Sequence, residues 1–130
     1  MARERFITLN NDMLANVADF AWAAGFFEGE GCIIIRPHSH CPSSISTQLT
    51  LTQKGTETDP PDVLVRFAKM FPHGKIYREK GRDLWRYTIS KKWYVKAALK
   101  SMLPWLGERR SDRAHECIRA IMNAPYLVKP

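Results

Sequence analysis

The pattern of apolar and polar positions changes from a helical period to strand alternation near Gly31. Upstream, small and apolar residues recur at helical spacing, which predicts a first helix that begins near Asp12 or Asp19 and ends at Gly29. Downstream, residues 31–40 and 44–52 alternate with a period of two, which is typical of half-buried strands. The first half of the chain is therefore predicted to be a helix and a hairpin, with a turn at Cys41-Pro42-Ser43-Ser44.

A second helix and a second hairpin are predicted after a loop at residues 55–61. Asp59 precedes two prolines and is predicted to cap a helix whose apolar stripe includes Leu64 and Phe67. Two alternating runs then follow, at 75–80 and 84–90, on either side of a Gly-Arg-Asp turn. The same helix and hairpin order thus occurs twice.

Two further helices complete the pattern. Ser90 is predicted to cap a helix that reaches about Leu103, where Pro104 ends it. The last helix is expected near Asp112 to Asn123. The order αββαββαα indicates an α+β fold, in which one antiparallel sheet is backed by helices.

Composition and charge narrow the class of protein. A chain of 130 residues, 45% hydrophobic and 25% charged, is predicted to be a single domain at 1–130 with an N-terminal tail over about 1–11. A net charge of +7 favours a polyanionic partner such as nucleic acid. The sequence contains neither a secretion signal nor a membrane-spanning run, so an intracellular location and no membrane partner are expected.

The cysteines give little support for a disulfide framework or for zinc. Three cysteines without a Cys-x-x-Cys pair do not indicate either one. A zinc site built from Cys32, His38, His40 and Cys41 is an alternative, although only its last part is compact in sequence.

The end of the first helix combines small residues with acids. Ala21, Gly25 and Gly29 recur every four residues and would form one smooth stripe, for packing either within the chain or against a second backbone. Glu28 and Glu30 lie at the end of the same helix, beside a sheet whose outward positions are polar and basic. Such a sheet face is either solvated or laid against nucleic acid. A carboxylate near a phosphate requires a bridging cation, which favours metal-assisted phosphodiester chemistry.

Three segments resemble one known family. Residues 23–31 (AAGFFEGEG) are similar to the signature motif of the LAGLIDADG homing endonucleases. The segments Leu51-Thr52-Gln53-Lys54 and Pro104 to Arg110 (PWLGERR) also fall where that family has them, and the resemblance covers about Asp19 to Met122. It implies a homing-endonuclease-like αββαββαα fold. Because the chain has one motif, it also implies a homodimer that acts on a pseudo-palindromic target.

The resemblance also implies roles for particular residues. Glu30, with a backbone oxygen of Gly29, would bind Mg²⁺ or Mn²⁺, although the family usually has Asp at this position. Gln53 would position water, and Arg109 would stabilise charge at the scissile phosphate, with Arg110 as the adjacent alternative. Without the resemblance, Gln53 would only form a hydrogen bond at the end of the hairpin. Arg109 would be a solvent-exposed residue at the start of a helix. The expected dimer interface comprises Ala21, Trp22, Gly25, Glu28 and Gly29. The expected DNA-binding residues are Arg36, His38, His40, Ser46, Gln48, Thr50, Arg78, Lys80, Arg86 and Thr88.

Two functions from different classes follow. The first is a site-specific, metal-dependent endonuclease that cleaves double-stranded DNA, takes no small-molecule substrate and drives the mobility of its own intron or intein. The alternative is a nucleic-acid-binding protein on the same scaffold that does not cleave, such as an RNA-splicing maturase or a DNA-binding regulator.

Overall fold

The predicted order of helices and strands is confirmed, with one short 3₁₀ helix added. The computed structural model describes residues 11–38 and 41–123. The elements are α1 (Asn11–Glu30), β1 (Gly31–His38), β2 (Cys41–Lys54), α2 (Asp62–Met70), β3 (Lys75–Arg78), β4 (Leu84–Ile89), α3 (Lys92–Met102), η1 (Leu103–Trp105) and α4 (Glu108–Met122).

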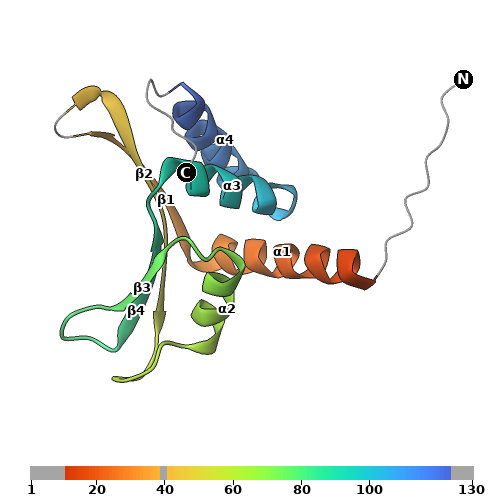
Figure 1. Cartoon of the computed structure of the whole chain (residues 1–130), viewed down its shortest axis with the longest axis vertical. Coiled ribbons are helices and arrows are strands. Elements are labelled where there is room, and N and C mark those ends of the chain that lie inside the picture. Colours follow the sequence, from red (N-terminus) through yellow and green to blue (C-terminus); the bar gives the residue numbers. More distant parts are fainter. Residues whose placement is uncertain (1–10, 39–40, 124–130) are drawn as a thin grey trace, which may run out of the picture.

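The four strands form one antiparallel sheet in the order β1-β2-β4-β3. Figure 1 shows this sheet on one side of the molecule and the helices on the other, with α1 leading away from the sheet. Gly31 pairs with Leu51, and Leu51 pairs with Tyr87 across the next strand. Each hairpin therefore turns one face toward the helices and leaves the opposite face uncovered by them.

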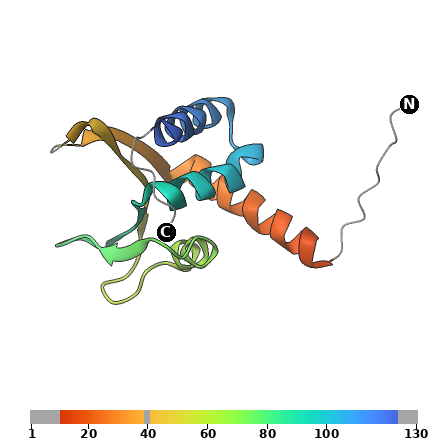
Figure 2. The ribbon, with the colours of Figure 1, turned by 45° about the horizontal axis from the view of Figure 1, so that its top comes forward.

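The hydrophobic core lies between the sheet and the helices. The sheet contributes Ile33, Leu49, Leu51, Tyr87 and Ile89, as the alternation predicted. The helices contribute Ala23, Ala24, Phe27, Leu64, Phe67, Val95, Leu99, Met102, Ala114, Cys117 and Ile121, all buried. Figure 2 shows that the N-terminal part of α1 extends beyond this layered body. No helix in the described part of the chain is both long and apolar enough to cross a membrane.

Several predicted boundaries were wrong. The segment at 41–44 belongs to β2, and the register shift next to it places Pro37 opposite Ile45 but His38 opposite Cys41. Helix α2 begins at Asp62 without a side-chain cap, because Asp59 instead closes a small turn with Thr56. Helix α3 likewise has Lys91, not Ser90, at its N-cap position.

Helix α4 begins four residues earlier than predicted. Its first residue is Glu108, so Arg109 and Arg110 belong to its first turn. Met122, the last helical residue, is 56% exposed, so the buried stripe of α4 ends at Ile121. In α1, Val17 is 42% exposed, so the buried part of that helix begins after it.

Candidate functional site

Glu28 connects the end of α1 to the beginning of α4. Its carboxylate accepts a hydrogen bond from the backbone N–H of Gly107, the N-cap residue of α4. Its other oxygen accepts one from Arg110 Nε at 3.2 Å. The Arg110 guanidinium also lies over the Phe27 ring, 5.7 Å from its centroid. A carboxylate at a helix N-terminus is favoured by the helix dipole, so the geometry gives Glu28 a structural role.

Glu30, in contrast, is exposed and forms no hydrogen bond or ion pair within the described part of the chain. It is the last residue of α1, and β1 begins at the next residue. A Cβ at Gly31 would lie 2.3 Å from the buried Phe27 ring, so only glycine allows this direct junction. The fold therefore presents a free carboxylate on a backbone held by both a helix and a strand.

Gln53 and Arg109 are also without polar partners among the residues that the structure describes. Gln53 is the penultimate residue of β2 and lies two residues beyond Leu51, the partner of Gly31. It therefore lies at the end of the sheet where α1 joins β1. Arg109 is exposed in the first turn of α4, where Arg110 is instead occupied by Glu28. Of the two arginines, Arg109 is the one whose charge is not neutralised.

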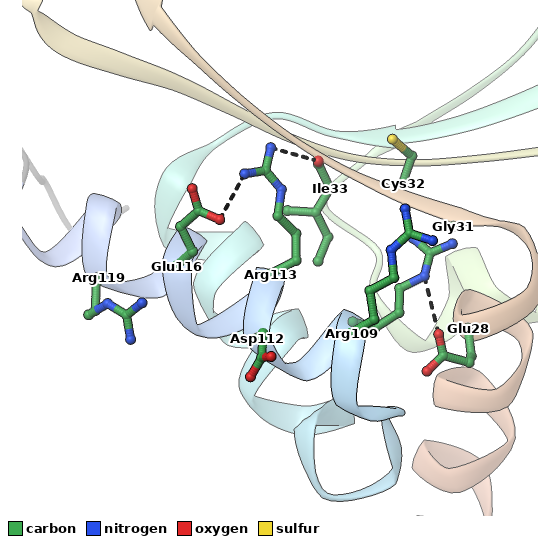
Figure 3. A pocket seen from close by; sticks show the side chains of 10 residues that line it. Glu28, Gly31, Cys32, Ile33, Arg109, Asp112, Arg113, Glu116 and Arg119 are labelled. Carbon is green, nitrogen blue, oxygen red and sulfur yellow. Dashed lines mark hydrogen bonds and ion pairs between the residues drawn. The ribbon is translucent and has the colours of Figure 1, made fainter.

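A groove of about 790 Å³ runs between the end of α1, β1 and α4. Figure 3 shows arginines of α4 pointing into it beside the β1 backbone. Arg113 donates to the Ile33 carbonyl at 3.4 Å and pairs with Glu116 at 3.0 Å. The lining residues are Glu28, Gly31, Cys32, Ile33, Arg109, Arg110, Asp112, Arg113, Glu116 and Arg119. The groove thus brings Arg109 near the end of α1, whereas Glu30 and Gln53 do not line it.

Gly25 and Gly29, two of the three small residues of the stripe on α1, are not packed against any other described residue. A Cβ added at Gly25 or Gly29 would meet no atom within 4 Å, and both residues are exposed. Trp22 differs, because it stacks on Phe26 and lies under Arg66, whose guanidinium carbon is 3.8 Å from the ring centroid. The interpretation of Gly25 and Gly29 as tight intrachain packing residues is therefore wrong, and this side of α1 is uncovered.

Most of the residues that are expected to bind nucleic acid lie on the sheet face opposite the helices. Register places Arg36 beside Ser46, and Thr50 beside Thr88, whose hydroxyls lie 3.4 Å apart. Gln48 also lies on this outer face, beside Ile34. Lys80 lies in the turn after β3. His40 and the side chain of His38 lie outside the described part of the chain.

The predicted outward orientation of Arg78 is wrong. Arg78 pairs with Trp85, which shares its face with the buried Tyr87, whereas Arg86 is on the opposite face. Arg78 donates instead to the Arg82 carbonyl at 2.9 Å and to Asp83 at 3.2 Å. Because β3 ends here, an arginine on its inner face can still reach solvent.

Sequence reasoning missed three residues on the outer face. Lys75 pairs with Thr88, and Tyr77, 44% exposed, pairs with Arg86. Glu79 follows on the same face and forms an ion pair with Arg86, with 2.5 Å between Oε1 and Nη2. Strict alternation around the partly buried Ile76 would have found all three.

No three His, Cys, Asp or Glu side chains in the described residues are close enough together to form a metal site. Three of the four residues of the alternative zinc site fall outside this search, because His40 and the side chains of His38 and Cys41 lie outside the described part of the chain. Cys32 is exposed and Cys117 is buried, and neither is in a disulfide. Burial raises the pKa of the Cys117 thiol to about 11, so this thiol is uncharged at neutral pH.

Comparison with known proteins identifies the family. The model of the LAGLIDADG endonuclease family matches residues 23–103. No curated protein matches the chain significantly. Among solved structures, the homing endonuclease I-CvuI in complex with its target is 21% identical, with a TM-score of 0.74 over 86% of this chain and 71% of that one.

Two further structures have the same fold. The LAGLIDADG meganuclease I-AabMI bound to uncleaved DNA is 19% identical, with a TM-score of 0.64 over 79% of this chain and 36% of that one. The group I intron-encoded homing endonuclease I-CeuI complexed with DNA is 14% identical, with a TM-score of 0.62 over 91% of this chain and 57% of that one. On the evidence of the family model, the chain belongs to the LAGLIDADG endonuclease family.

Proposed function

We propose that this protein is a homodimeric homing endonuclease that cleaves both strands of a specific DNA site with the help of a divalent cation. The observation that carries the proposal is the exposed, unpartnered carboxylate of Glu30, which lies beside an uncovered stripe of small residues on the same helix. One chain then supplies one acid and one dimerisation surface. A two-fold pair of chains would supply two of each.

The dimer would form through the uncovered side of α1. Gly25 and Gly29 cost helix stability, about 1 kcal/mol each relative to alanine, and no close packing against other described residues offsets that cost. Close approach of a second α1 would explain why glycine occupies both positions. Such a two-fold contact would bring the two Glu30 carboxylates toward a common centre.

The residues at the end of α1 fit a hard divalent cation. Glu30 is an exposed oxygen donor without a competing partner, and the backbone carbonyl of Gly29 is the neighbouring oxygen. Magnesium prefers oxygen ligands and usually completes its shell with water and phosphate. When bound, such an ion would lower the pKa of water and neutralise charge on the reacting phosphate. I-CvuI was solved with its target in the presence of Ca, and with the I-CreI target, which was not cleaved, in the presence of Mg; both structures are consistent with the use of a divalent cation.

The other free side chains would act directly on the DNA. Arg109 has no carboxylate partner among the described residues, so its charge is available to a phosphate group and to the negative charge that develops there. Gln53, with an amide donor and an acceptor, would hold a water molecule in line with the phosphorus atom. Arg110 is a weaker candidate for the phosphate contact because Glu28 already binds it.

The outer face of the sheet would lie in the major groove. Side chains of Arg36, Ser46, Gln48 and Lys75 point to this side, and none has a polar partner among the described residues. Donors and acceptors of these types read base edges, while the overall charge of +7 favours the phosphate backbone. His38 and His40 are proposed contacts on the basis of sequence alone.

Cleavage of DNA from the insertion site of the gene tests the proposal. Wild-type protein should bind this DNA with either Mg²⁺ or Ca²⁺ and cut both strands only with Mg²⁺ or Mn²⁺. Glu30→Gln should bind with similar affinity and fail to cut, because a neutral amide is a poor cation ligand. Asp62→Asn removes one negative charge at the exposed start of α2 and should cut like the wild type.

Two results would contradict the proposal. Tight binding of that DNA by the wild type without any nicking in Mg²⁺ or Mn²⁺ would favour a non-cleaving maturase or regulator. A stable monomer at micromolar concentration, measured by sedimentation, would exclude the shared two-fold site.

A further inference from the structure

Glu79 and Arg86 form an ion pair on the outer face of the sheet. Arg86 is in β4, opposite Thr52 on one side and Tyr77 on the other. Glu79 lies two residues beyond Tyr77, at the diagonal position from which a long side chain reaches Arg86. Their charged atoms are 2.5 Å apart, and the side chain of Arg86 is 39% exposed and that of Glu79 is 24% exposed. The pair is therefore held together at the surface that the proposed function assigns to DNA.

An acid on such a surface calls for an explanation. Phosphate groups repel a carboxylate, so Glu79 weakens any contact with the DNA backbone made beside it. The Arg86 Nε–H is buried and has no partner in the described part of the chain, so the exposed part of the guanidinium is its outer end. Burial of Nε and the contact with Glu79 together limit the directions in which Arg86 can reach.

The exposed atoms of the pair match one base pair. In the major groove, a guanine presents two acceptors, O6 and N7, and the cytosine paired with it presents the N4 amine next to O6. Arg86 offers N–H donors to guanine, and Glu79, which accepts from Arg86, retains an acceptor for the cytosine amine. An A·T pair places a donor and a methyl group among these positions and lacks this match.

We propose that Glu79 and Arg86 read one G·C base pair in each half of the target, and that Glu79 keeps Arg86 directed at the base edge and away from phosphate. The inference rests on the proposed DNA-binding role of the sheet, but it does not require cleavage. Arg86 contributes specificity more than affinity, because its charge is already partly neutralised. Glu79 is both a reading residue and a positioning residue.

Selection from duplex oligonucleotides with randomised sequence tests this inference. In the sequences bound by the wild-type dimer, one position per half-site should be a G·C pair. The protein should bind DNA with G·C at that position roughly tenfold to a hundredfold more tightly than DNA with another base pair there. Arg86→Lys keeps the charge but loses the planar fork, and should lose the preference at that position alone. Glu79→Gln should weaken the same preference. It should also steepen the dependence of affinity on salt by about one unit per subunit, because the released Arg86 can contact phosphate.

Arg78 and Asp83 supply the matched control. They form an ion pair of the same chemistry at 3.2 Å, but Arg78 is on the opposite face of the sheet. Asp83→Asn removes the same charge as Glu79→Gln, so it should leave the selected sequence and the salt dependence unchanged. Thermal unfolding of each variant checks that the fold is retained, since all of these side chains are partly exposed.

The outcomes separate this inference from the proposed function. If Glu79→Gln and Arg86→Lys select the same sequences as the wild type, the inference is overturned, and it is also overturned if Asp83→Asn has the same effect as Glu79→Gln. If the wild type selects no sequence at all, both proposals fail. If the expected preference is found in a protein that never cuts its selected DNA, the endonuclease proposal fails and the base-reading pair is supported.

Discussion

Glu28 and Glu30 are two residues apart, yet their replacement should have opposite effects on stability and activity. Glu28 accepts hydrogen bonds from the backbone N–H of Gly107, the N-cap residue of α4, and from the side chain of Arg110, whereas Glu30 has no partner among the described residues. Replacing Glu28 with alanine therefore leaves the start of α4 without its acceptor and leaves Arg110 without its counter-ion. Replacing Glu30 removes no hydrogen bond or ion pair within the described part of the chain.

The expected magnitude follows from these contacts. A hydrogen bond to a charged group contributes about 1.5–3 kcal/mol, and a surface ion pair about 0.2–1 kcal/mol. The side chains of Glu28 and Arg110 are 36% and 28% exposed, so water compensates in part when the contact is lost. We therefore expect Glu28→Ala to lower the free energy of unfolding by about 2 kcal/mol. Glu28→Gln keeps an acceptor for Gly107 but not the charge, and should lower it by about 1 kcal/mol.

Urea denaturation followed by circular dichroism measures these differences. Glu30→Gln serves as the control and should stay within about 0.5 kcal/mol of the wild type, as surface substitutions usually do. A double-mutant cycle with Arg110→Ala isolates the ion pair from the hydrogen bond to Gly107. If Glu28→Ala proves as stable as Glu30→Gln, the structural role of Glu28 is refuted.

Three further predictions concern the small residues and the buried thiol. Gly25→Leu should leave the free energy of unfolding of the monomer unchanged or slightly raise it, because leucine is the better helix former. The same substitution should prevent dimerisation, and a dimeric mass in sedimentation would contradict this. Gly31→Ala should destabilise the fold by at least about 2 kcal/mol, because its methyl group would overlap the buried Phe27 ring, and a urea midpoint equal to that of the wild type would refute the tight junction. Burial raises the pKa of Cys117 from 9.0 to about 11, so this residue's contribution to stability is complete below pH 9 and should be lost as pH rises through 11. Unfolding measured from pH 8 upward should show a smaller decline for Cys117→Ala, and an identical decline would contradict the assignment.

Alternation and helical spacing predicted the sheet and its core well, because they reflect local geometry. Leu49, Leu51, Tyr87 and Ile89 are all buried as expected. Alternation failed at Arg78, where charge was assumed to favour the outer face although register determines the face. Near the end of a strand both faces reach water, so polarity no longer indicates orientation.

The parts of the site that depend on distant residues could not be predicted from the sequence. The start of α4 is stabilised by Glu28, which is 79 residues away from Gly107, so no local cap marks it. The family motif identified both acids, but only the tertiary structure shows that one is bound and the other free. The pairing of Glu79 with Arg86 likewise requires the hairpin register.

The contact between Arg113 and the Ile33 carbonyl has a consequence for the behaviour of the protein at high concentration. β1 is an edge strand, and an unpaired edge is a template on which a strand from another molecule can add. The guanidinium that reaches this carbonyl occupies one of the acceptors such a strand would need, and the bulk of the Arg113–Glu116 ion pair lies beside the edge. We therefore expect Arg113 to hinder edge-to-edge association at β1 while leaving the sheet face open.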